Sequence, residues 1–140
     1  MGKKNKEVKI PSSKKKIEEG TKKKSLQTDW FFMTPHEVHA KDIAQHLKTE
    51  TNVLIELWEE MNILQIELPN KVTVDFEPME GFDDPSDLEF IRNRNIKTIF
   101  AVYISSGVIE GELLIIIKGI CSRWNGILCA DTNDFQPVFD

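Results

Sequence analysis

Residues 51–78 read TNVLIELWEEMNILQIELPNKVTVDFEP, and they decide the fold class. Apolar side chains occupy every second position over residues 64–68 and again over residues 72–76, with polar side chains between them. This alternation is typical of strands with one buried face, and residues 69–71 suit a short turn between the two runs. We therefore predict an antiparallel meander with strands near residues 53–58, 62–68 and 71–77.

The first part of this stretch also fits a helix. An apolar stripe at helical spacing runs through it, formed by Val53, Leu57, Met61, Leu64 and Leu68. The sequence therefore leaves open whether residues 53–68 form one helix or two strands.

Upstream, residues 28–37 (TDWFFMTPHE) predict a helix start. Thr34 suits the N-cap, Pro35 the first helical position, and Glu37 the third position after the cap. A narrow apolar stripe at helical spacing follows, formed by Ala40, Ile43, Ala44 and Leu47. Residues 30–33 pack before this helix, either as its hydrophobic staple or as a short first strand.

Downstream, we predict a short helix over residues 86–94, with Leu88 and Ile91 facing inward. Residues 96–104 (IKTIFAVYI) are nearly all apolar, which predicts a central strand covered on both faces.

Residues 109–124 carry apolar side chains at helical spacing, and the following Asn-Gly pair suits a helix end. Two internal glycines and three successive isoleucines favour a strand instead, but we predict a helix. Residues 127–130 (ILCA) then predict a last short strand. Apolar side chains after it indicate that the tail folds back onto the core: Phe135, Val138 and Phe139.

The predicted element order is α-β-β-β-α-β-α-β. It indicates an α+β two-layer sandwich, in which a mixed, mostly antiparallel sheet carries helices on one face. We assign residues 26–140 to a single acidic α+β domain and residues 1–25 to a disordered lysine-rich arm, because the arm lacks apolar periodicity.

Charge is divided unevenly along the chain. Residues 1–25 hold ten lysines and three glutamates and so carry +7, which leaves −12 on the remaining residues of a chain with net charge −5. The acidic side chains are densest over residues 77–89, where Met79 and Phe82 lie among them. Such a potential speeds encounter with a basic partner. The predicted partner-binding residues are Glu77, Glu80, Phe82, Asp83, Asp84, Asp87 and Glu89.

No pattern of residues predicts a catalytic or metal centre. His36, His39 and His46 all fall on the predicted first helix, where Asp42 could join only a weak half-site, and the zinc-peptidase spacing is absent. The acidic end of residues 125–137 lacks the ligands of a calcium loop. We expect neither a cofactor nor enzymatic activity.

The two cysteines, Cys121 and Cys129, lie in apolar stretches and are expected to be buried, structural and reduced. The sequence shows no signal peptide, and no apolar run is long enough to span a bilayer. We expect a cytoplasmic protein without membrane insertion.

Residues 84–104 (DPSDLEFIRNRNIKTIFAVYI) and 124–137 (WNGILCADTNDFQP) resemble the second half of small cytoplasmic α+β immunity proteins of bacterial polymorphic-toxin systems. The resemblance lies in the order of elements and in the acidic end, and it carries over no functional residue. The lysine-rich arm departs from that family.

Two functional hypotheses follow. The first is a non-enzymatic module that binds a basic protein, such as a toxin, through its acidic face and neutralises it. The alternative is a nucleic-acid-associated accessory protein tethered by residues 1–25, because lysines contact phosphates. The arm contains no arginine, which weakens base readout.

Overall fold

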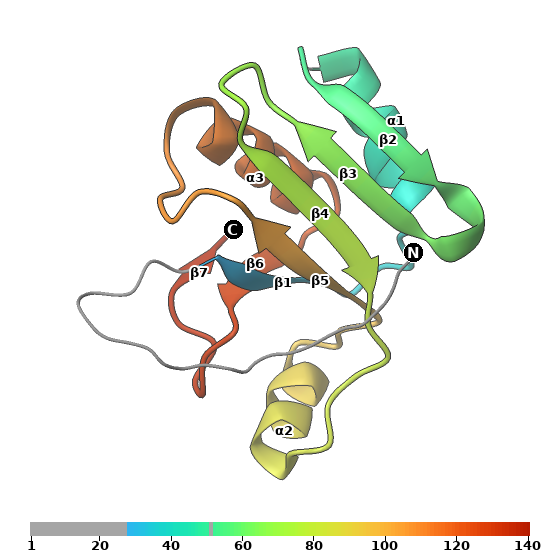
Figure 1. Cartoon of the computed structure of the whole chain (residues 1–140). Helices are drawn as coiled ribbons and strands as arrows, with labels where there is room; N and C mark the ends of the chain where they lie inside the picture. The colour runs from blue at the N-terminus through green and yellow to red at the C-terminus, as the bar shows by residue number, and fades with distance from the viewer. Residues whose placement is uncertain (1–27, 51) are drawn as a thin grey trace.

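The computed structural model describes residues 28–50 and 52–140 (Figure 1). The predicted arm, residues 1–25, lies outside these ranges. The described chain is an α+β fold, in which three α-helices accompany one seven-stranded antiparallel sheet. None of the described helices combines the length and apolar character needed to cross a bilayer.

The strands lie in the order β2-β3-β4-β5-β1-β6-β7 across the sheet. Their bounds are β1 Asp29–Thr34, β2 Leu54–Trp58, β3 Ile63–Glu67, β4 Thr73–Pro78, β5 Thr98–Ile104, β6 Ile127–Ala130 and β7 Val138–Phe139. The helices are α1 Ala40–Glu50, α2 Pro85–Asn93 and α3 Gly111–Arg123, with a 3₁₀ turn, η3, over Glu59–Met61.

The predicted meander is confirmed, since β2, β3 and β4 pair in sequence order as antiparallel neighbours. The stretch that also fitted a helix therefore forms two strands, joined through η3. Helices α2 and α3 lie where the sequence predicts them, and β6 is the ILCA strand. The tail does fold back, because β7 pairs with β6 and Phe135 is buried.

The prediction of a mixed sheet is wrong for the described strands, because all their pairings are antiparallel. Strand, helix and strand in succession, as in β5-α3-β6, favour a parallel pair. Here β1 lies between β5 and β6 and is antiparallel to both. The alternative of a short first strand over residues 30–33, which the predicted order left out, is confirmed as β1, and the predicted order also lacked β7.

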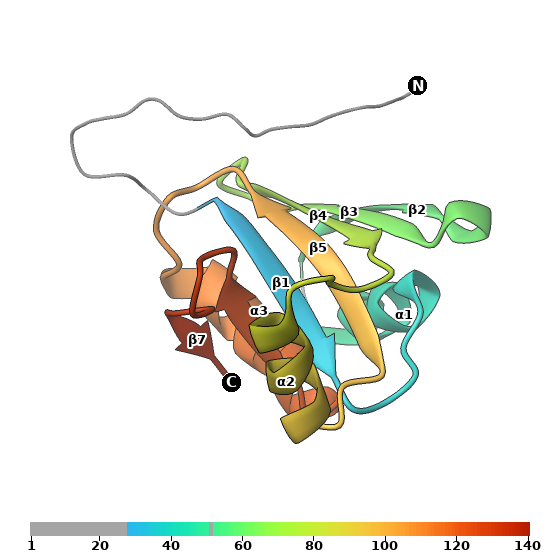
Figure 2. The ribbon, with the colours of Figure 1, turned by 90° about the horizontal axis from the view of Figure 1, so that it is seen from below.

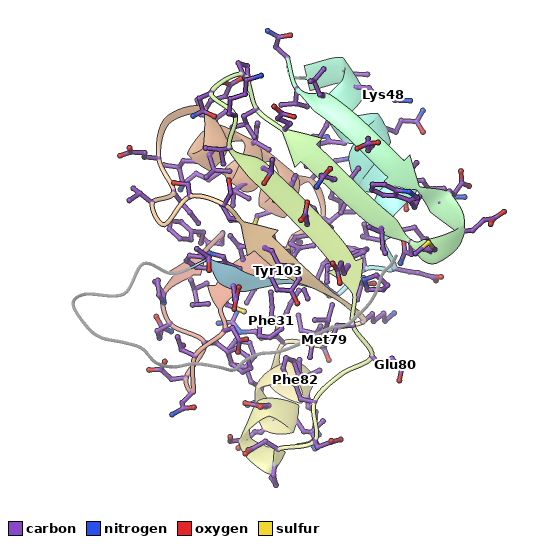
Figure 3. The ribbon with its side chains drawn as sticks, in the orientation of Figure 1. Phe31, Lys48, Met79, Glu80, Phe82 and Tyr103 are labelled. Carbon is purple, nitrogen blue, oxygen red and sulfur yellow. The ribbon has the colours of Figure 1, made fainter. Side chains whose placement is uncertain are left out.

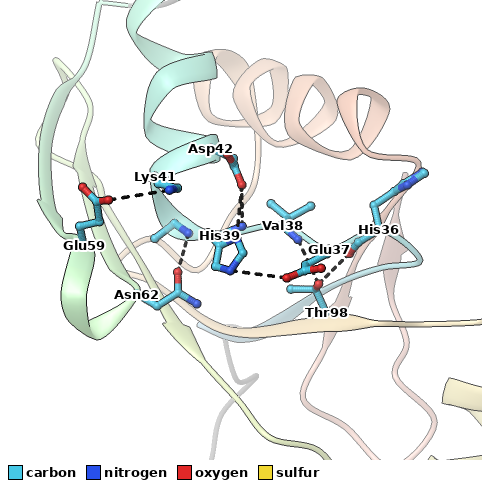
Figure 4. A network of polar contacts seen from close by, with 10 residues as sticks. His36, Glu37, Val38, His39, Lys41, Asp42, Glu59, Asn62 and Thr98 are labelled. Atoms are coloured by element: carbon cyan, nitrogen blue, oxygen red, sulfur yellow. Dashed lines mark hydrogen bonds and ion pairs between the residues drawn. The ribbon is translucent and has the colours of Figure 1, made fainter.

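The predicted helix start at Thr34 is wrong. Thr34 is the last residue of β1, where it pairs with Thr98, and its hydroxyl donates a hydrogen bond to the carbonyl of Trp124 at 2.6 Å. Because that pairing holds the backbone extended, the helix begins only at Ala40. The carboxylate of Asp42 then accepts a hydrogen bond from the backbone N–H of His39 at 2.9 Å (Figure 4).

Helices cover both faces of the sheet, so the prediction of helices on one face is also wrong. Apolar residues of α1 and α3 pack on the face that presents Trp30 and Phe32. Residues of α2 pack on the opposite face, against Phe31 and Met33. Strand β1 is buried on both sides, and it therefore requires cover on both.

The inward residues of α2 differ from those predicted. Ile91 does pack on the second core, but Leu88 is 40 % exposed. Phe90 points inward instead, and its ring lies 4.6 Å from that of Phe135 between centroids, with the two planes tilted by 40°. The residues after β6 supply this ring, and nothing in the sequence near α2 indicates it.

On the face of the sheet where α2 packs, the helical cover does not extend over the meander. Figure 2 shows β2, β3 and β4 with α1 on one side of them, while α2 lies next to β1 and β5. No described helix covers the other side of the meander.

Gly126 tests the packing around β1, and Gly119 of α3 is the comparison. A Cβ at Gly126 would lie 2.7 Å from both the carbonyl oxygen of Met33 and the ring of Phe32. We expect Gly126→Ala to destabilise the fold by about 1–3 kcal/mol. In α3, the nearest atom to a Cβ at Gly119 is Nε2 of His46 at 3.7 Å, so Gly119→Ala should stabilise by up to about 1 kcal/mol. Urea denaturation measures both, and equal midpoints for the two variants would contradict this packing.

Candidate functional site

The uncovered side of the meander forms a continuous surface that we call the open face. Its residues alternate along the strands with the buried core residues, and so point away from α1 and α3. The open face consists of Leu54, Glu56, Trp58, Ile63, Gln65, Glu67, Thr73, Asp75, Glu77 and Tyr103, with Asp29 of β1 at its border.

A row of polar side chains crosses the open face at right angles to the strands. The register pairs Glu56 with Gln65, Gln65 with Asp75, Asp75 with Tyr103, and Tyr103 with Asp29. Directly opposed residues in antiparallel strands have Cβ atoms about 5 Å apart. The pairing thus places three carboxyl groups, an amide and a phenol in one line.

Negative charge converges on Tyr103. Burial and then the charges of Glu77, Asp29, Asp131 and Asp75 raise the pKa of Tyr103 to about 12. These four carboxylates come from β4, β1 and the residue after β6. The phenol therefore lies in a strongly negative potential, although it is 43 % exposed.

Asp75 is the most constrained of these acids. Burial raises the pKa of its carboxyl group, and a hydrogen bond with Gln65 opposes that rise. Its Oδ1 atom is buried and has no hydrogen-bond partner among the described residues. Leaving a buried polar atom unsatisfied costs stability, and groups of this kind cluster at functional sites.

The strands that form the open face carry no basic side chain of their own. None of the described strands contains a lysine or an arginine; the described basic residues all lie on helices or in connecting segments. Lys71, in the turn before β4, reaches the border of the open face and pairs with Glu67 at 3.6 Å. Because Lys71 is 83 % exposed, that pair is weak.

Apolar side chains flank the acidic row at the β2 edge. Leu54 is 69 % exposed and Trp58 is 43 % exposed, and Met61 of η3 extends the same edge. Strand β2 pairs with β3 alone, so its other edge is unpaired within the described chain. Exposed apolar side chains beside charged ones are typical of protein-binding surfaces.

The predicted partner-binding residues divide into three groups. Glu77 lies on the open face, next to Tyr103. Glu80, Asp83 and Glu89 are exposed, but they lie on the connection before α2 or on α2 itself; Figure 3 shows Glu80 pointing away from Tyr103.

The third group consists of one helix cap and two partly buried residues. The Asp84 carboxylate caps α2, and hydrogen bonds from the hydroxyl and backbone N–H of Ser86 lower the pKa of Asp84. Asp87 is partly buried in the first turn of α2. Phe82 packs in the second core, with ring centroids 5.1 Å from Phe31 and 5.6 Å from Phe135 (Figure 3).

Sequence reasoning missed most of the open face. The alternation in the meander placed Gln65 and Asp75 on the polar side of their strands, but it did not say that this side lacks cover. Asp29 and Asp131 act on Tyr103 only because β1 lies next to β5 in the sheet and β6 lies next to β1.

The cysteines and histidines are the other chemical candidates. Burial raises the pKa of each thiol, Cys121 and Cys129, to about 12, so neither supplies a thiolate at neutral pH. Of the three histidines, His46 alone lies within α1. Among the described residues, no three His, Cys, Asp or Glu side chains are placed to hold one metal ion.

The Tyr103 environment can be titrated directly, because Tyr103 is the only tyrosine of the chain. We expect a tyrosinate absorbance midpoint near pH 12 in the folded protein, and a lower midpoint in Glu77→Gln, which removes one nearby charge. Glu89→Gln removes the same charge from α2 and is the control, with circular dichroism verifying the fold at each pH. Identical midpoints in wild type and Glu77→Gln would contradict the convergence of charge.

The loss of folding stability caused by burial of the Asp75 carboxylate is also measurable. Since burial raises its folded-state pKa, the charged carboxylate destabilises the folded state at neutral pH, and the penalty disappears below the ordinary pKa. We expect Asp75→Asn to be more stable by about 1 kcal/mol at neutral pH and equal to wild type near pH 3. Glu56→Gln, an exposed neighbour in the same row, should show no comparable gain. Urea-denaturation midpoints of wild type and both variants, measured at neutral pH and near pH 3, test this expectation.

Comparison with known proteins gives no relative for this chain: no protein-family model matches the sequence, and no curated protein or solved structure is detectably similar to it.

Proposed function

We propose that this protein is a non-enzymatic binding module that recognises a basic protein partner through the open face. The observation that carries the proposal is the convergence of four carboxylates on Tyr103, on a sheet surface whose strands hold no basic residue. The exposed side chains of Trp58 and Leu54 add apolar contact area beside this charge.

The layout of the carboxylates suits several cationic side chains rather than one ion. The acids lie on β4, on β1 and just after β6, and neighbouring strands are about 4.8 Å apart. Lysine or arginine heads of a partner can each meet a different carboxylate at such spacings. Complementary charge accelerates encounter and excludes acidic partners, while aromatic anchors supply affinity.

We favour a role in which this binding inhibits the partner. The sequence resembles immunity proteins of bacterial polymorphic-toxin systems, which implies neutralisation of a toxin in the cytoplasm. A basic toxin whose active surface is covered by the open face would lose access to its own acidic substrate. This role needs no catalytic group from the present chain.

Two matched variants test the surface. Glu56→Gln, Asp75→Asn and Glu77→Gln together neutralise three acids of the open face. Glu80→Gln, Asp83→Asn and Glu89→Gln neutralise three acids of the α2 region and leave the same net charge. We expect quantitative mass spectrometry of affinity-purified complexes to show a partner with wild type and the α2-region variant, reduced at least tenfold with the open-face variant.

Other results would exclude the open face as the binding surface. Equal loss in both variants would indicate a net-charge effect, and loss in the α2-region variant alone would favour the segment predicted from the sequence. A partner retained by both but removed by nuclease would support the nucleic-acid alternative, which rests on the ten lysines of residues 1–25.

A further inference from the structure

We infer that the lysine-rich segment of this chain, residues 1–25, docks on the open face of its own domain. The segment would then occupy the surface that we assign to a basic partner. The contact requires no partner, so it does not depend on the proposed function.

Charge complementarity is the first argument. Residues 1–25 carry +7, with ten lysines concentrated in short runs that include residues 14–16 and 22–24. The described strands carry no basic side chain, and four carboxylates surround Tyr103. Within this chain, residues 1–25 are the one segment with a large positive excess.

The point where the segment joins the sheet is the second argument. Asp29 is the first residue of β1 and belongs to the acidic row, opposite Tyr103. The carbonyl of Thr28 accepts a hydrogen bond from the backbone N–H of Ile104 at 2.9 Å, which holds the start of the described chain beside β5. Residues 1–27 are therefore attached at the border of the open face.

The segment is also long enough. From β1 across β5, β4 and β3 to β2 there are four strand spacings, or about 19 Å. About six extended residues cover that distance. Lys24 and Lys22 precede Asp29 by five and seven positions, so they can reach Asp75 and the more distant Glu56.

Because residues 1–25 belong to the same chain as the open face, even weak ion pairs between them can favour docking. Single exposed ion pairs contribute little and are screened by salt. Linkage to the same chain supplies an effective concentration in the millimolar range, which favours docking without any strong individual pair. A basic partner must then displace the segment from the open face. Only a partner that binds the open face more tightly than the segment does can bind, which favours partners with more positive charge or with apolar contacts to Trp58.

A spin label provides the test. We would attach a nitroxide to Ser13→Cys, sixteen positions before Asp29, in the full chain. The native thiols are buried and stay unlabelled, as the unsubstituted protein would verify. At low salt we expect the amide signals of Gln65, Asp75 and Tyr103 to lose at least half their intensity, and those of Lys48 and Ile115, on the helices of the other face, to change little.

The matched control carries the same label and has all ten lysines of residues 1–25 replaced by glutamine. It should lose the selective broadening, as should the original protein in about 1 M salt, where the screening length is about 3 Å. Equal broadening by the lysine and glutamine segments, or no broadening of the open face, would overturn the inference.

A mixed sample separates docking within one chain from docking between two. Labelled protein without ¹⁵N is combined with unlabelled ¹⁵N protein, and we expect no broadening of the open face at the same concentration. Broadening there would assign the surface to a second copy and overturn the inference. Because the sample contains no partner, a negative result leaves the affinity-purification test of the proposed function unaffected.

Discussion

The fold depends on the burial of β1 from both sides. Successive side chains of this strand point to opposite faces, and Trp30, Phe31, Phe32 and Met33 are all buried. Placed between β5 and β6, β1 must therefore be covered twice: by α1 and α3 on one face, and by α2 with the ring of Phe135 on the other. The helix arrangement follows from this requirement.

The same requirement explains where cover is missing. The outward positions of β3 and β4 are polar or only partly buried, so they need no helix, and the short α2 extends no further than the residues that pack with β1. The uncovered strands carry acids and no basic side chain of their own, which keeps the surface hydrated and gives it a negative potential. The open face is therefore the part of the sheet that α2 and the residues packed with it leave uncovered.

The success of the sequence predictions depended on how local the underlying interaction is. Period-two alternation identified the meander, and helical spacing identified α3, because both patterns reflect burial of one side of a single element. The helix start at Thr34 failed because a strand pairing between Thr34 and Thr98, sixty-four positions apart, overrides a good local capping pattern. The packing of Phe82 was not predicted because its partner rings, Phe31 and Phe135, come from distant segments.

The sequence by itself determined the α+β class, most strands and helices, the burial of both cysteines and the separation of charge between residues 1–25 and the rest of the chain. These properties depend on composition and on the periodicity of neighbouring residues. Only the tertiary structure decided the strand order, the double cover of β1 and the acidic row through Asp75 and Tyr103. Those features depend on register between strands that are far apart in the chain, and no local pattern encodes that register.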